Sequence, residues 1–95
     1  VVVRSANFPV ADKAAAEGFV SCKAGERATG GGAFFPNDAL NTIGNGDAIV
    51  ESVPTTPGFT GGADGATPNG WYVSVNNGSG GGATTFDVYA ICAAP

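Results

Sequence analysis

The 95-residue sequence contains no histidine and no methionine, only four basic residues and only two cysteines. Without histidine, neither a Ser-His-Asp nor a Cys-His catalytic arrangement can form. Without histidine or a Cys-x-x-Cys pair, we also expect no zinc site. Four basic side chains are too few for the positive patch that nucleic acids require, so we expect no nucleic-acid partner.

Long apolar runs are absent as well. No stretch reaches the roughly 18 consecutive apolar residues of a membrane-spanning helix, so we expect no membrane insertion. Charged residues make up 13% of the chain, and we interpret the net charge of -4 as an aid to solubility. The chain begins VVVRSANFPV, without a charged and then apolar leader. We interpret it as a mature product or an excised domain.

Alternation of apolar and polar residues between turn-forming clusters predicts strands. The expected strands cover residues 1–8, 18–23, 27–35, 47–53, 70–77 and 84–93. In residues 47–53 the period of two groups Ile49, Glu51 and Val53 on one face. The helix-prone run 10–18 is short, and we interpret it as a loop or a single turn. We therefore predict one all-β domain over residues 1–95, an antiparallel sandwich or small barrel of about six strands with one disulfide.

The two cysteines, Cys22 and Cys92, occur in a small, weakly charged chain, which favours a secreted protein with one disulfide. Both fall on the inward register of their expected strands, so they can meet across the core. The alternative is a pair of buried free thiols in a cytosolic protein. The disulfide interpretation predicts an extracellular location.

Three consecutive glycines, Gly30 to Gly32, interrupt an expected strand. Glycine normally weakens a strand interior because it packs nothing and loses the most backbone entropy. We predict that these glycines leave a bare strip of backbone on which a large side chain lies flat. Trp71, the only tryptophan, is on an inward register and is the candidate. A β-bulge at the same place is compatible with this prediction.

Tyr72 and Tyr89 lie on the register opposite to the expected core, so we expect them on an exposed or interface surface. Phe59 is the only large side chain of the long Pro/Gly/Thr segment 54–70, and it either tucks back onto the sheet or contacts a partner. These three aromatics could stack against a sugar. The eight acidic residues show no pairing in the sequence, so we expect no enzyme, no cofactor and no metal site.

Four segments together resemble a known family: CKAGERATGGGAFF, ESVPTTP, NGWYVSVNN and VYAICA. The pattern is similar to that of a repeat-free β-domain of secreted actinobacterial proteins, and the match covers roughly residues 22–93. The chain departs from it at Lys23, where proline is common. Similar domains end collagen-like or fibrous chains and occur in phage tail proteins. The resemblance implies a non-enzymatic domain at the C-terminal end of a longer fibrous protein, and it points to a homotrimer.

Apolar residues on both faces of the first and last strands favour self-association, because burial of a single face does not explain both. We expect the interface to use Val2 of the N-terminal strand with the outward Tyr89 and Ile91, and Arg4 to pair with Asp87. The predicted function is therefore structural or adhesive, in a secreted or virion fibre. The alternative is a monomeric carbohydrate-binding module that uses Tyr72, Tyr89 or Phe59.

Overall fold

A computed structural model of the chain describes residues 1–36, 47–56, 60–61, 64–78 and 82–95. The described strands are β1 (Val2–Val10), β2 (Ala15–Ser21), β3 (Arg27–Phe34), β4 (Asp47–Thr56), β5 (Thr60–Gly61), β6 (Gly70–Asn77) and β7 (Thr84–Ala93). Over the same residues there is no helix that could cross a membrane. The strands expected at 70–77 and 84–93 are confirmed residue for residue.

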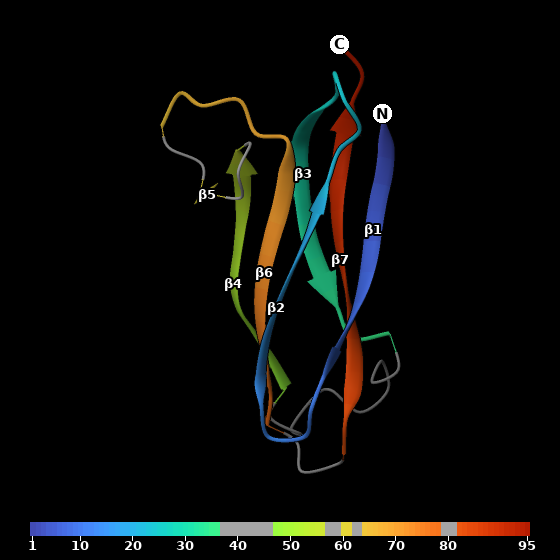
Figure 1. Cartoon of the computed structure of the whole chain (residues 1–95), viewed down its shortest axis with the longest axis vertical. Helices are drawn as coiled ribbons and strands as arrows, with labels where there is room; N and C mark the ends of the chain where they lie inside the picture. Colours follow the sequence, from blue (N-terminus) through green and yellow to red (C-terminus); the bar gives the residue numbers. More distant parts are fainter. Residues whose placement is uncertain (37–46, 57–59, 62–63, 79–81) are drawn as a thin grey trace.

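Two antiparallel sheets form the molecule, and Figure 1 shows them side by side along its long axis. Sheet A has the strand order β1-β7-β3, and sheet B has the order β2-β6-β4-β5. The chain passes from sheet A to sheet B through the turn between β1 and β2, where Ala14 N–H donates to Ala11 C=O at 3.2 Å. The two sheets are separate, so the predicted all-β class is confirmed, and the fold is the sandwich rather than the barrel.

The core lies between the two sheets and comes mainly from their central strands. Strand β7 contributes Phe86, Val88, Ala90 and Cys92, and β6 contributes Val73 and Val75, all with no exposed surface. These residues alternate with outward-facing ones, as the period of two predicted. Each sheet therefore presents one outer face, and these two faces are the surfaces on which a function can act.

The three glycines lie inside β3, as expected. Gly31 is opposite Ala90 and faces the core, where a Cβ atom would overlap the ring of Trp71 from the other sheet. The prediction that Trp71 lies over the glycine strip is thus confirmed. A register shift between Ala28 and Gly30 supplies the compatible bulge. Phe8 covers Gly18 in the same way, with its ring 2.6 Å from a Cβ placed there.

Two local expectations are wrong. Residues 15–17, read as loop or turn, belong to β2, because Ala15 pairs with Asn76 and extends the ladder with β6. In β4, Ile49 and Glu51 do not share a face. The ladder shifts between them, so that Ile49 is opposite the buried Val75, whereas Glu51 is opposite the outward Ser74. A bulge inserts one residue and reverses the faces that follow.

Candidate functional site

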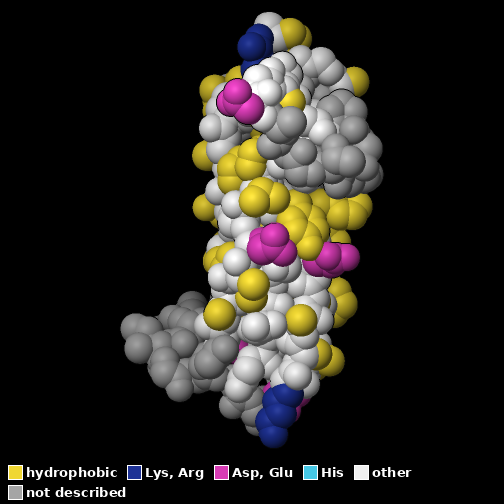
Figure 2. Space-filling model, turned by 90° about the vertical axis from the view of Figure 1, so that its left-hand side faces the viewer, with side chains coloured by type: hydrophobic (Ala, Val, Ile, Leu, Met, Phe, Trp, Pro, Cys, Tyr) yellow, Lys and Arg dark blue, Asp and Glu magenta, His cyan; other side chains and the backbone are white. Residues whose placement is uncertain are grey.

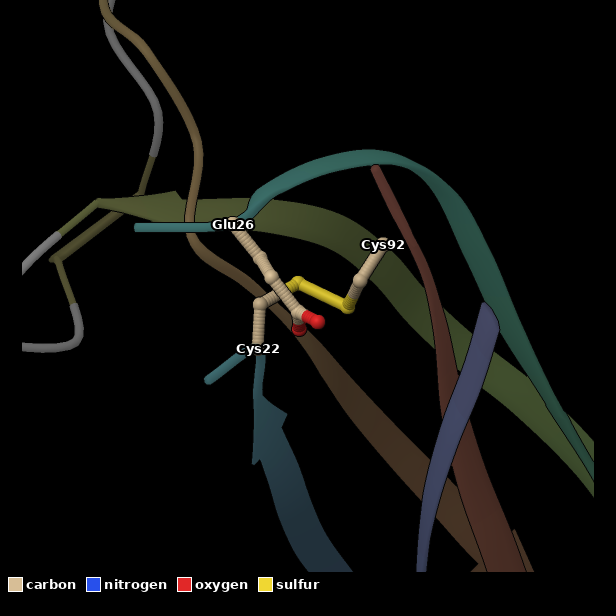
Figure 3. A group of neighbouring side chains, drawn as sticks. All are labelled: Cys22, Glu26 and Cys92. Carbon is tan, nitrogen blue, oxygen red and sulfur yellow. A yellow bond between two sulfur atoms is a disulfide. The ribbon is translucent and has the colours of Figure 1, made fainter. Parts of the chain in front are cut away.

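The disulfide joins the two sheets at one end of the sandwich. Cys22 directly follows β2, and Cys92 lies in β7; their Cα atoms are 5.8 Å apart, which confirms the predicted pairing. In Figure 3 the side chain of Glu26 extends alongside this bond. The three side chains are close enough to bind one metal ion, but the thiolate is the form of cysteine that binds metals. The disulfide is compatible with an extracellular location.

Glu26 links strand β1 to the turn between β2 and β3. Its carboxylate accepts bonds from Arg4 Nη2 at 2.8 Å and from the backbone N–H of Lys23 at 2.9 Å. The Arg4 bond, followed by the Lys23 bond, holds the pKa of Glu26 below its ordinary value. The expected pair of Arg4 with Asp87 is therefore wrong. Asp87 instead accepts a bond from Asn7 Nδ2 at 2.6 Å.

The outer face of sheet A is apolar at its centre. Val3 is opposite Ile91, and Tyr89 is flanked by Ser5 on β1 and by Gly32 on β3. Val3 is 64% exposed, whereas Tyr89 and Ile91 are half-buried. Tyr89 and Ile91 thus lie side by side on an outer face, as expected. Val2 is opposite the buried Cys92, so Val3 takes the place on this face that was expected for Val2.

Glycine shapes this face as well. A Cβ atom on Gly32 would lie 2.7 Å from the Tyr89 hydroxyl oxygen. The side chain of Tyr89 therefore packs against the backbone of β3 and does not project away from the sheet. The Tyr89 ring also approaches that of Phe34, with centroids 6.4 Å apart, and Phe34 is 50% exposed. The result is a low, continuous apolar surface across the middle of the sheet.

The outer face of sheet B carries acidic groups on either side of its central strand. Glu17 of β2 and Glu51 of β4 are both cross-strand neighbours of Ser74 on β6. In the adjacent row, Phe19 and Val53 flank Tyr72. Figure 2 shows the side of the molecule on which β4 lies in Figure 1, and there acidic side chains adjoin hydrophobic ones midway along its length. We call Glu17, Glu51, Tyr72 and Ser74 the acidic shelf.

Hydroxyl groups hold both carboxylates of the acidic shelf. Tyr72 Oη donates to Glu17 Oε2 at 2.5 Å, and Ser74 Oγ donates to Glu51 Oε1 at 3.5 Å. The bond to Glu17, more than burial or the two negative charges, raises the pKa of Tyr72 to about 12. Together with Ala15 and Ala16, these groups line an open depression of about 420 Å³.

An aromatic ring beside ionised carboxylates can pack against the apolar face of a ligand while the carboxylates accept its hydrogen bonds. Sequence reasoning found Tyr72 but not Glu17, Glu51 or Ser74. The residues are far apart along the chain, and their alignment depends on the bulge in β4. The sequence analysis placed Glu17 in a loop or turn and Glu51 on one face with Ile49 and Val53, so no signal indicated that the two acids align.

The two tyrosines do not form one platform. Tyr72 belongs to the outer face of sheet B and Tyr89 to the outer face of sheet A, with the core between them. Phe59 lies outside the described residues. A sugar-binding surface would therefore rest on one tyrosine at a time.

Comparisons of this chain with protein-family models, curated proteins and solved structures found no match. The fold defines it as a small, disulfide-linked β-sandwich. The resemblance to the secreted actinobacterial domain stays a prediction. The two outer faces of the sandwich are the features of this chain that indicate a function.

Proposed function

We propose that this chain is a non-enzymatic structural or adhesive domain of a secreted or virion fibre, and that it self-associates through the outer face of sheet A. One observation carries the proposal: the contiguous apolar surface formed by Val3, Ile91, Tyr89 and Phe34 on neighbouring strands. Contiguous apolar surfaces of more than a few hundred Å² are uncommon on monomeric proteins and mark interaction sites.

The free edge of sheet A supports the same conclusion. Strand β1 is an edge strand of nine residues, and its only charged residue is Arg4. The side chain of Arg4 is directed to Glu26. Long edge strands usually carry charges that prevent pairing with other chains. An edge without them favours association at or beside this face.

The disulfide supports an extracellular setting for the assembly. A single bond that closes a separation of 70 residues persists in oxidising compartments and is rare in the cytosol. A small domain benefits from it because its core is limited. The fibre context and the expected number of three chains come from the family resemblance and stay predictions.

Light scattering on the purified protein tests the proposal. We expect the unmodified chain to be an oligomer at tens of micromolar, with an interface of at least about 1,000 Å² in total. Ile91→Asp or Val3→Asp should dissociate it, because each buries a charge in an apolar contact. Val50→Asp is the matched control, since Val50 is 56% exposed on β4 of the other sheet.

Circular dichroism and intact mass should show that each variant keeps its fold and its disulfide. A monomeric unmodified protein at these concentrations would contradict the proposal. So would an oligomer that tolerates both Ile91→Asp and Val3→Asp.

The acidic shelf supports a second candidate, carbohydrate binding, because it combines an aromatic ring with hydrogen-bond acceptors in a depression. A glycan array with Tyr72→Ala tests it. Tyr89→Ala, which removes the same side chain from the opposite face, is the control. Binding that is lost in the first variant and kept in the second would favour this candidate. An array without any binding would reject it.

A further inference from the structure

Two opposite charges lie at opposite ends of the outer face of sheet A. Arg27, the first residue of β3, is opposite Ala93 and exposed. Asp87 lies on β7 opposite Phe34, toward the other end of the strand. The distance between these ends of β7 is roughly 20 Å at about 3.3 Å per residue. The apolar surface of Ile91 and Tyr89 separates them.

Ala28 and Cys92 confirm which way Arg27 faces. They are opposite each other and both buried, so the preceding pair, Arg27 and Ala93, is directed outward. Asp87 is half-buried, and its described side-chain partner is the uncharged amide of Asn7. The described salt bridge of the chain joins Arg4 to Glu26, so it involves neither Arg27 nor Asp87. Both charges thus remain available to a partner.

This arrangement is self-complementary under one symmetry operation. Consider a two-fold axis in the plane of contact that runs across the strands between Tyr89 and Ile91. It places the Arg27 end of one copy over the Asp87 end of the other, and the reverse. Ile91 of each copy then meets Tyr89 of the other. Arg27 of each copy reaches both Asp87 and the ring of Phe34, which are neighbours across β3 and β7.

We propose that the occupant of this face is a second copy of the chain, packed face to face in an antiparallel two-fold dimer with two Arg27–Asp87 contacts. This inference rests on the proposed self-association and adds its geometry. It is an alternative to the three-chain assembly expected from the family resemblance. The low relief left by Gly30 and Gly32 allows the two sheets to approach closely, as in sheet-on-sheet packing.

Sheet B cannot pair with itself in this way. Glu17 and Glu51 lie on both sides of its central strand, so a face-to-face pairing of sheet B would bury carboxylates that have no basic partner on the described strands of that face. Burial of an unpaired charge is costly and suppresses that pairing. The charges therefore direct the second copy to sheet A.

Two charge-reversal variants test the geometry by sedimentation velocity and native mass spectrometry. In Arg27→Asp, two acidic residues face each other at each contact; in Asp87→Arg, two basic residues do. Each variant alone should show a dissociation constant raised at least about tenfold. Mixed in equal amounts, the two should form a 1:1 heterodimer, because both contacts are again between opposite charges.

Lys13→Asp and Asp64→Lys are the matched controls, since they make the same charge changes at exposed positions away from the outer face of sheet A. They should dimerise like the unmodified protein, and mixing them should change nothing. Thermal melts and intact mass verify that all four variants are folded and disulfide-linked.

The outcomes separate the two proposals. An unmodified chain that is monomeric at tens of micromolar rejects self-association itself. An unmodified oligomer that both reversals leave intact rejects only the two-fold geometry. A three-chain assembly, or reversal variants that dissociate alone but do not combine when mixed, also overturns the two-fold pairing.

Discussion

The two outer faces of the sandwich are built from the same strand alternation and have opposite characters. On sheet A, Tyr89 lies down over Gly32, and the centre of the face is apolar. On sheet B, Tyr72 is bound to Glu17, and the centre of the face is acidic. The difference does not come from the tyrosines. It comes from the residues on the adjacent strands: Gly32 is directly opposite Tyr89, whereas Glu17 lies diagonally from Tyr72, opposite Ser74 in the next row.

This contrast shows how a neighbouring strand determines the chemistry of an outward aromatic residue. Where the neighbour has no side chain, the ring covers the backbone and adds to a smooth surface. Where the neighbour is a carboxylate, the hydroxyl is engaged and the ring stands at the rim of a depression. The first surface suits a second protein face, and the second suits a smaller ligand that can accept and donate hydrogen bonds.

We expect the largest loss of stability when the disulfide that links the two sheets is removed. The double variant Cys22→Ala/Cys92→Ala should lose about 4 kcal/mol of unfolding free energy, because the bond closes a long loop in the unfolded chain. Urea denaturation of the monomeric Ile91→Asp background, with and without the two cysteines, measures this loss apart from any assembly. A loss below about 1 kcal/mol would show that the packed core alone holds the sheets together.

We expect the next largest effect from a substitution on the inner face of β3, compared with the same substitution on its outer face. Gly31→Val should cost about 3 kcal/mol, because the new side chain overlaps Trp71 and the backbone of Tyr89. Gly30→Val is the matched control, and both variants are made in the monomeric Val3→Asp background because Gly30 lies on the face proposed for self-association. A Cβ atom at Gly30 meets only Ile91 Cδ1, at the ordinary distance of 3.7 Å. Gly30→Val should therefore change the unfolding free energy by less than about 1 kcal/mol. Equal melting temperatures for the two variants would refute the account of the inner glycine.

We expect the smallest effect at the acidic shelf, as a change in the pH dependence of stability. The pKa of Tyr72 is raised from the ordinary value near 10 to about 12, so the folded state holds its proton more tightly than the unfolded state. The stability from the Glu17 bond is therefore fully present below about pH 10 and is lost as the pH rises through about 12. Tyr72→Phe should remove this part of the alkaline loss in urea titrations.

Glu17→Gln provides the control, since it keeps the phenol and removes the charge that favours its neutral form. The pKa of Tyr72, followed by the ultraviolet absorbance of tyrosinate, should fall in this variant. An unchanged tyrosine titration would mean that Glu17 does not hold the hydroxyl in solution.

The sequence by itself determined the fold class, the disulfide and the inner faces of β6 and β7. Alternation in β6 and β7 identified the buried residues correctly, because each strand has one face on the core and a period of two is unambiguous there. The even cysteine count and the inward registers predicted the bond between Cys22 and Cys92. The glycine strip and the single tryptophan predicted the contact of Gly31 with Trp71.

Only the tertiary structure decided the outer faces. The bulge in β4 separates Ile49 from Glu51, and no local pattern indicates a one-residue shift in a ladder. Cross-strand register brings Glu17 and Glu51 to either side of Ser74, and places Val3 rather than Val2 beside Ile91. Burial constrains a core residue through its own hydrophobicity, whereas an exposed residue acquires its role from the strands that lie next to it.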